Sequence, residues 1–287
     1  MSNSILLIGA DSLMGKEIRE VYHLAPRLQL ATAALDATAV FAASEEEIEV
    51  VAAVDDEMIA DAAAVIVAAN GEVAREKLRD CAAPIIDLTG AIEKPARAIP
   101  NAVAALLAEF LEHLEGYEPV TRVIATAFVP ASEYGRAGIN ELQKQTVALL
   151  SFKPMPKEIF DAQSAFNFLA VAKSQDSARR SMGTSPPISL RVAQAPVFHG
   201  VSASVWVEFA SRVSTPKLIA HLKGEGVDVR DGDLDPPDNT GVAGMSGYAA
   251  GAIERDAMNG NAAWFWLAAD NLRLRAELAV DAAREVI

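Results

Sequence analysis

The N-terminal stretch restricts the fold more than any other part of the sequence. Ser4–Ile8 is a short apolar run that ends at Gly9, as a buried parallel strand would. A tight turn follows up to Gly15, and apolar residues then recur at helical spacing through Ile18 and Val21. A strand, a glycine turn and a helix in this order are typical of the opening of a dinucleotide-binding unit.

The same alternation of strand and helix patterns continues through the first hundred residues. Strands are predicted at 30–34, 49–54, 62–69 and 83–88, and helices at 72–81 and 101–115. This rhythm predicts an α/β domain with a parallel, Rossmann-type sheet. Asn70, Thr89 and Gly90 directly follow two of the strands. They therefore fall at the sheet edge where open α/β folds bind ligands.

The stretch 190–209 contains the clearest strand of the second half. From Val201 to Phe209, β-branched and small residues alternate with Ser, Trp and Glu, which indicates a strand with one buried face. A second apolar run, 192–198, precedes it. Gly200 separates the two runs and predicts a break in the ladder, through a bulge or a close backbone approach.

Composition excludes several classes of function. The net charge is −14 and basic residues form no run, which argues against nucleic acid or an anionic membrane as partner. The four histidines lack metal-ligand spacing, so we expect no metal site. Cys81 is the only cysteine, and its place at the end of a predicted helix indicates a structural residue and not a nucleophile. No apolar segment reaches the ~20 residues of a membrane span, and no signal peptide precedes the first strand. We therefore expect a cytoplasmic protein.

Short motifs in a fixed order run through nearly the whole chain. They are Gly9 to Gly15, Pro100-Asn101-Ala102, Gly138 with Glu141-Leu142 and Gln145, Ala195-Pro196-Val197 with Gly200-Val201-Ser202, and Trp266 with Asp270-Asn271-Leu272. Together they resemble the aspartate-semialdehyde dehydrogenase family, and most closely its catalytically depleted branch of uncertain function. The resemblance implies a dinucleotide-binding domain over 1–118 and 262–287. It also implies an α+β dimerisation domain over 119–261 with a mostly antiparallel sheet, and a homodimer.

The resemblance also shows which chemistry is missing. Ala102 stands where the family has its nucleophilic cysteine, and Val129 where it has the glutamine that holds the acyl intermediate. Gln194 replaces the arginine that binds the substrate carboxylate, and Val201 replaces the acid/base histidine. The family reaction needs these groups. We therefore expect no catalytic residue at these positions, and a dimer that binds a partner, a nucleotide or the true enzyme.

An oxidoreductase of the aldehyde or oxo class, with a bound NAD(P) and altered chemistry, is the alternative. His199 and Glu208 are its candidate residues, and an ordinary strand position is the simpler interpretation of each.

The cofactor of the resembled family is NADP. By the resemblance, its binding residues would be Gly9, Ser12, Leu13, Met14, Gly15, Asn70, Thr89, Gly90 and Asn271. Ser12 takes the place of a glycine that lets the backbone approach the pyrophosphate, and Arg275 takes the place of a glycine beside the nicotinamide. These two changes predict weak or absent NADP binding. The opposite outcome also stays open, because Arg275 can contact a phosphate and the helix N-terminus still attracts an anion.

Overall fold

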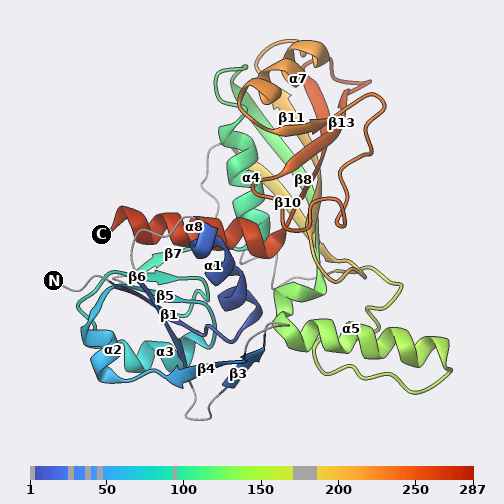
Figure 1. Ribbon diagram of the computed structural model, residues 1–287. Coiled ribbons are helices and arrows are strands. Elements are labelled where there is room, and N and C mark those ends of the chain that lie inside the picture. The colour runs from blue at the N-terminus through green and yellow to red at the C-terminus, as the bar shows by residue number, and fades with distance from the viewer. Residues whose placement is uncertain (1–3, 25–28, 36–39, 44–47, 93–95, 171–185) are drawn as a thin grey trace. The chain divides into compact units, whose positions relative to one another are not determined.

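A computed structural model describes residues 4–24, 29–35, 40–43, 48–92, 96–170 and 186–287 (Figure 1). The chain divides into two compact units, and each is described by itself. Unit 1 comprises residues 1–99 and 275–287, and unit 2 comprises residues 100–274.

Unit 1 is built on a sheet whose strands lie in the order β3-β4-β2-β1-β5-β6-β7. The strands are β1 (Ser4–Ile8), β2 (Gln29–Ala34), β3 (Val40–Ala43), β4 (Ile48–Ala53), β5 (Ala62–Val67), β6 (Ile85–Asp87) and β7 (Ala96–Ala98). All neighbouring pairs are parallel except β3 with β4. The helices that begin in this unit are α1 (Leu13–Leu24), α2 (Asp56–Ala60) and α3 (Gly71–Lys77). The order reverses at β1, and open α/β sheets bind their ligands beyond the carboxyl ends of the strands at such a reversal.

The apolar runs seen in the sequence form the core of unit 1. Four consecutive residues of β1, Ile5 to Ile8, are almost completely buried, as in a strand covered on both faces. Helix α3 ends at Lys77, four residues before the predicted end at Cys81. The chain turns after Leu78, where the N–H of Cys81 bonds the Leu78 carbonyl, and this turn brings Ile85 into register with β5.

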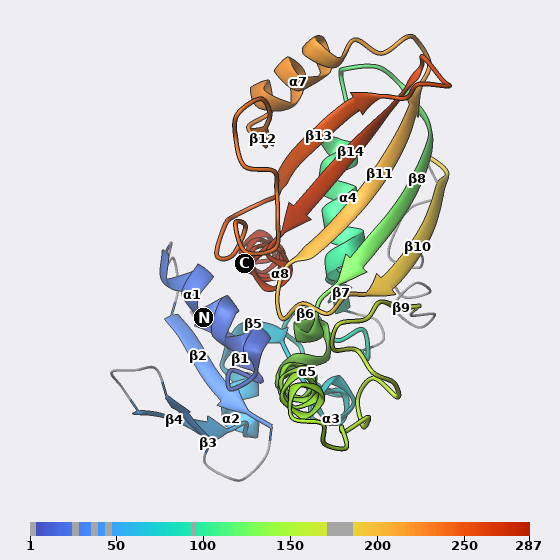
Figure 2. The ribbon, with the colours of Figure 1, turned by 90° about the vertical axis from the view of Figure 1, so that its right-hand side faces the viewer.

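Unit 2 is built on a second sheet, with the strand order β12-β13-β14-β11-β8-β10-β9 (Figure 2). The strands are β8 (Val120–Val129), β9 (Leu169–Ala170), β10 (Ile188–Gln194), β11 (Val201–Phe209), β12 (Asp228–Arg230), β13 (Ala249–Arg255) and β14 (Ala262–Ala269). The β8–β10 and β12–β13 pairs are parallel and the other four are antiparallel. The predicted architecture, a Rossmann-type parallel sheet plus a mostly antiparallel α+β sheet, is therefore confirmed.

Among the residues that the structure describes, the helical elements of unit 2 are α4 (Ala102–Glu112), the 3₁₀ turn η1 (Ala131–Tyr134), α5 (Gly135–Leu150) and α7 (Thr215–Gly224). Helix α8 (Asn271–Glu285) begins in unit 2, and its residues from Arg275 belong to unit 1. Asn101 caps α4: its Oδ1 accepts the N–H of Ala104 at 3.0 Å. The buried side of α4 and the inward side chains of β8, β11 and β14 form one apolar cluster. We call this side of the sheet the inner face, and the side away from α4 the outer face.

Strands β10 and β11 are not paired with each other, although the sequence suggested one ladder broken at Gly200. Strand β8 lies between them, parallel to β10 and antiparallel to β11. The close backbone approach at Gly200 is present nevertheless. Its φ is +82°, and a Cβ there would lie about 3 Å from atoms of Asn239, whose amide donates to the Gly200 carbonyl.

The units divide at other residues than the resemblance implied. The expected boundaries were 118/119 and 261/262, whereas the structure divides at 99/100 and 274/275. Two elements explain the shift. Strand β14 pairs with β11 over eight residues, and α4 contributes Leu106 and Phe110 to the core of unit 2.

Candidate functional site

The loops that follow β1, β5 and β6 approach one another closely in unit 1. A Cβ on Gly9 would lie 3.0 Å from Ala69, and a Cβ on Gly71 would lie 1.9 Å from the hydroxyl oxygen of Thr89. A Cβ on Gly15 would lie 2.2 Å from the Gly9 carbonyl, so α1 packs directly on the turn that precedes it. The structure therefore brings together most of the expected cofactor residues, at the carboxyl edge of the sheet.

Ser12 is the N-terminal cap of α1. Its hydroxyl donates to the Gly9 carbonyl at 2.7 Å and accepts the N–H of Gly15 at 2.9 Å. A phosphate at a helix N-terminus is held by the backbone N–H groups of the first turn. One of those groups is already bonded to Ser12, and the serine Cβ occupies the surface that a glycine would leave open.

Asp87 organises the loop after β6. The side chain is fully buried and accepts the N–H and hydroxyl of Thr89 at 2.7 and 2.6 Å, and the N–H of Ile92 at 2.9 Å. Arg275 donates to the Leu88 carbonyl at 2.5 Å. The guanidinium therefore bonds the end of the strand that carries Asp87. The Ser12 cap and this bond both engage groups at the carboxyl edge of the sheet.

Three of the four positions that the resemblance aligned with the family's catalytic residues are core residues of unit 2. Ala102 at the start of α4, Val129 at the end of β8 and Val201 at the start of β11 belong to the same apolar cluster and are 0–2% exposed. Val129 and Val201 both point to the inner face, where α4 packs. None of these side chains can act as a nucleophile, an acid or a base.

Gln194 ends β10 beside these residues, paired in register with Val129. The side chain is completely buried, and its Nε2 donates to the Ala195 carbonyl at 2.9 Å. Its Oε1 has no hydrogen-bond partner among the residues that the structure describes. A neutral amide in this place cannot form the ion pair with a carboxylate that an arginine offers.

Asn271 is fully buried, and its side chain is bonded within unit 2. Its Oδ1 accepts the hydroxyl of Ser132 at 3.1 Å and the N–H of Gly200 at 3.0 Å. Its Nδ2 donates to Glu133 at 2.9 Å. The amide thereby ties the start of α8 to η1 and to the entry of β11. This role is structural, and it leaves Asn271 little bonding capacity for a cofactor.

Glu141 and Gln145, the polar residues of the motif on α5, bind the loop that follows this helix. Glu141 is 4% exposed and accepts the backbone N–H groups of Glu158, Ile159 and Phe160 at 2.7, 2.8 and 3.2 Å. Gln145 accepts two further backbone N–H groups and donates to two carbonyls of the same loop. Both side chains therefore fix residues 156–165 against α5. The motif could be recognised in the sequence, but its contact with residues 156–165 could not be predicted.

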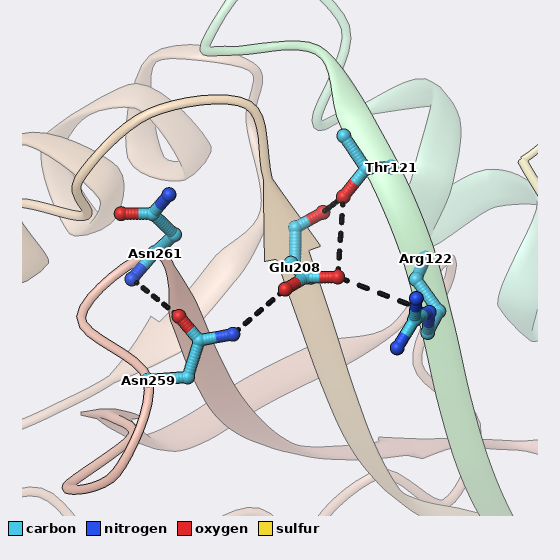
Figure 3. Close-up of polar contacts among 5 residues, drawn as sticks. All are labelled: Thr121, Arg122, Glu208, Asn259 and Asn261. Carbon is cyan, nitrogen blue, oxygen red and sulfur yellow. Dashed lines mark hydrogen bonds and ion pairs between the residues drawn. The ribbon is translucent and has the colours of Figure 1, made fainter.

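The other chemically reactive candidates lie elsewhere. The Cys81 thiol donates to the Ala83 carbonyl at 3.7 Å in a turn of unit 1, which agrees with a structural role. His199 is exposed, in the segment between β10 and β11. Glu208 is bonded to Thr121 and to Asn259 and lies 3.8 Å from Arg122, at the far end of β11 from Val201 (Figure 3).

Two findings concern the described part of the chain as a whole. Within it, no three His, Cys, Asp or Glu side chains come close enough together to hold a metal ion. Within the same residues, every helix is too short or too polar to cross a membrane.

Comparison with known proteins gives relatives for both units. A USG-1 protein homolog of Pseudomonas aeruginosa is 29% identical over an alignment of 252 residues, with 74% of this chain and 74% of that protein covered. An aspartate-semialdehyde dehydrogenase of Rickettsia bellii is 30% identical over 205 residues, 66% of this chain and 61% of that protein. A solved structure from Vibrio cholerae, aspartate semialdehyde dehydrogenase II complexed with ASA, has the same fold. Its TM-score is 0.87 at 20% identity, with 100% of this chain and 98% of that chain covered.

A protein family covers most of unit 2. The family described as "Semialdehyde dehydrogenase, dimerisation domain" matches residues 113–274, from the end of α4 through β14 to the start of α8. Since this match includes more than half of the residues, the chain belongs to the aspartate-semialdehyde dehydrogenase family.

Proposed function

We propose that this protein is a non-catalytic dimer of the aspartate-semialdehyde dehydrogenase family, with a binding or regulatory role. One observation supports the proposal: Ala102, Val129 and Val201, which the resemblance aligns with the family's catalytic residues, are buried in one apolar core. A catalytic cysteine, glutamine or histidine needs contact with a substrate. Ala102, Val129 and Val201 are instead packed among apolar side chains of the core. Gln194 adds the loss of the positive charge that would hold a carboxylate.

The test is an assay of the purified protein with aspartate semialdehyde, phosphate and NADP, followed by the absorbance of the reduced nicotinamide. Loss of a covalent nucleophile lowers turnover by about 10⁴-fold or more, so the expected rate is indistinguishable from that without protein. Turnover near one per second would contradict the proposal. If a Cys81→Ser change abolished that turnover, the nucleophile would be Cys81.

A double substitution, Ala102→Cys with Val201→His, separates two explanations of the inactivity. If only the nucleophile and the acid/base were missing, this variant would recover turnover. We expect little recovery, because Gln194 and Val129 still leave the substrate without its carboxylate and acyl contacts. The imidazole and thiol would also enter a packed core, where overpacking costs stability.

Weak or absent NADP binding belongs to the same proposal. The Ser12 hydroxyl takes the N–H of Gly15, and Arg275 bonds the Leu88 carbonyl. Isothermal titration calorimetry with NADP is expected to give no binding at micromolar concentrations. A dissociation constant in the low micromolar range would contradict it.

The homodimer is proposed to form through the outer face of the unit 2 sheet. Ile124 and Trp264 on this face are 43% and 42% exposed, and Phe128 and Trp266 beside them stack at a centroid distance of 5.8 Å. Exposed apolar side chains in such a group mark an interface. Light scattering at micromolar concentration is expected to give twice the chain mass, and a monomer mass would contradict the dimer.

The second candidate is an oxidoreductase of the aldehyde or oxo class with altered chemistry. His199 favours it, because this exposed imidazole lies on the segment between Gln194 and Val201. Turnover of any member of an aldehyde panel with NAD or NADP, lost on His199→Ala, would favour this second candidate over the first.

A further inference from the structure

The outer face of the unit 2 sheet carries a row of apolar side chains in direct register. Ile124 on β8 lies opposite Trp206 on β11, and Trp206 lies opposite Trp264 on β14. Side chains opposite each other on antiparallel strands are in contact distance. The three form a continuous apolar strip across the sheet.

Both tryptophans of the strip are held by one carboxylate. Oδ2 of Asp256 accepts the indole N–H of Trp206 at 3.0 Å and that of Trp264 at 2.9 Å. Oδ1 of the same residue accepts the backbone N–H groups of Met258 and Asn259, each at 2.8 Å. Asp256 thus accepts four N–H groups, two on each oxygen.

This arrangement requires an acceptor on both sides of the carboxyl group. An ionised aspartate offers acceptors alone, whereas an asparagine offers one oxygen and one N–H₂ group. An asparagine at position 256 would therefore direct donors at two N–H groups, whichever way its amide turned. The amide can therefore accept either the two backbone N–H groups of the turn or the two indole N–H groups, but not both pairs.

The turn that carries Asp256 is itself anchored to the sheet. Asn259 donates to Glu208 at 2.7 Å and accepts the N–H of Asn261 at 3.0 Å (Figure 3). Glu208 also lies 3.8 Å from Arg122 on the neighbouring strand. The carboxylate of Asp256 therefore has a fixed position relative to the strands that carry the two tryptophans.

The third tryptophan is bonded independently of Asp256. The indole N–H of Trp266 donates to the Pro237 carbonyl at 3.0 Å. All three indole N–H groups of the chain are thus bonded within unit 2. The exposed surfaces of the tryptophan rings can therefore form apolar contacts with a partner that provides no hydrogen-bond acceptor.

We propose that Asp256 holds Trp206 and Trp264 as a preformed anchor, and that the anchor binds the same surface on a second copy of this chain. The inference rests on the proposed dimer and names the residue that prepares its interface. A second copy suits the strip, because it offers the same apolar rings, and because the family that matches residues 113–274 is described as a dimerisation domain. Anchors that are rigid before binding lose less conformational entropy when the complex forms.

The experiment measures the indole resonances and the dimer dissociation constant of the full chain. In the Asp256→Asn variant, two of the three ¹H–¹⁵N indole signals are expected to shift, and the Trp266 signal is expected to stay in place as an internal control. Sedimentation velocity should show a dissociation constant about tenfold or more above that of the unchanged chain, as expected when a central tryptophan pair is disturbed. Asp233→Asn, on an exposed loop residue, makes the same change in charge and should leave both readouts unchanged.

Asp256→Ser guards against failure of the first variant to fold. Its hydroxyl can still accept the N–H groups of the turn, but it lacks the second oxygen that reaches the indoles. Two shifted signals and a weakened dimer in either folded variant support the proposal. If the chain without substitutions is a dimer and the variants have the same dissociation constant, the anchor is overturned and the dimer is retained. If the chain without substitutions is a monomer, both the dimer and the anchor are overturned.

Discussion

Replacing Glu141 with glutamine is expected to destabilise unit 2 by about 3 kcal/mol. The carboxylate is almost completely buried, and it forms two pairs of bonds. One oxygen accepts the N–H groups of Glu158 and Ile159 at 2.7 and 2.8 Å, and the other accepts those of Phe160 and Gln145 at 3.2 and 3.3 Å. A glutamine side chain has a single acceptor oxygen, so one pair must lose its acceptor.

The magnitude follows from these four bonds. The glutamine oxygen would turn to the shorter pair, and its N–H₂ group would then face the donors of Phe160 and Gln145. Two lost bonds cost about 1–2 kcal/mol each, and two retained bonds lose charge assistance worth about 1 kcal/mol each. Because a neutral group costs less to bury than a charge, about 1–2 kcal/mol is regained, which leaves the net loss of about 3 kcal/mol.

Tryptophan fluorescence during urea unfolding measures this loss in unit 2 alone, because Trp206, Trp264 and Trp266 are the only tryptophans of the chain and all belong to that unit. The control is Glu158→Gln, which makes the same chemical change at an exposed residue of the loop that Glu141 holds. The control should stay within about 0.5 kcal/mol of the unchanged chain. An equally small effect for Glu141→Gln would refute the assignment of Glu141 as the residue that holds the loop.

Three further outcomes are expected. Ser12→Gly frees the N–H of Gly15, so calorimetry should detect NADP binding that is stronger than in the unchanged chain; no gain would show that the Ser12 cap does not limit binding. Gly71→Ala places a methyl group on the Thr89 hydroxyl, so the melting temperature of unit 1, followed by circular dichroism, should fall by several degrees; an unchanged value would show that this contact relaxes freely. The N–H groups of Asn259 and Met258 hold the pKa of the Asp256 carboxyl below its ordinary value. Its contribution to stability is therefore present above about pH 4 and is lost as the pH falls further. Acid titration of the indole signals should show this loss in the unchanged chain and not in Asp256→Asn, and equal titrations would contradict it.

Much of the fold was predictable because local patterns coincide with tertiary roles. The run Ser4–Ile8 is apolar on both faces and becomes the central strand of a covered sheet. Asn101 is a good cap at the start of an apolar periodic segment, and it caps α4. Strand neighbours are set by long-range packing. For that reason the insertion of β8 between β10 and β11 left no trace in the segment around Gly200.

The resemblance assigns residues to the candidate site, and that assignment stays a prediction. The sequence alone indicates that Ala102 and Val201 cannot perform the family's chemistry. The burial of both in one core, and the bonds that occupy Asn271, depend on segments far apart along the chain. Asp256 was not singled out at all. In the sequence, Asp256 is an aspartate before a strand that carries tryptophans. Its bonds to two indole groups can be predicted only when the register of β11 and β14 is known.

The strands at the two margins of the unit 2 sheet limit how copies of the chain can assemble. Among the residues that the structure describes, β9 has two residues and β12 has three, so the outermost strand at each margin offers only a short row of backbone groups to another chain. Joining of sheets side by side, which leads to open-ended fibres, is thereby disfavoured. Contact through the broad face brings identical surfaces together about a twofold axis, and such a contact closes after two chains. The short margins thus favour a finite assembly over polymerisation.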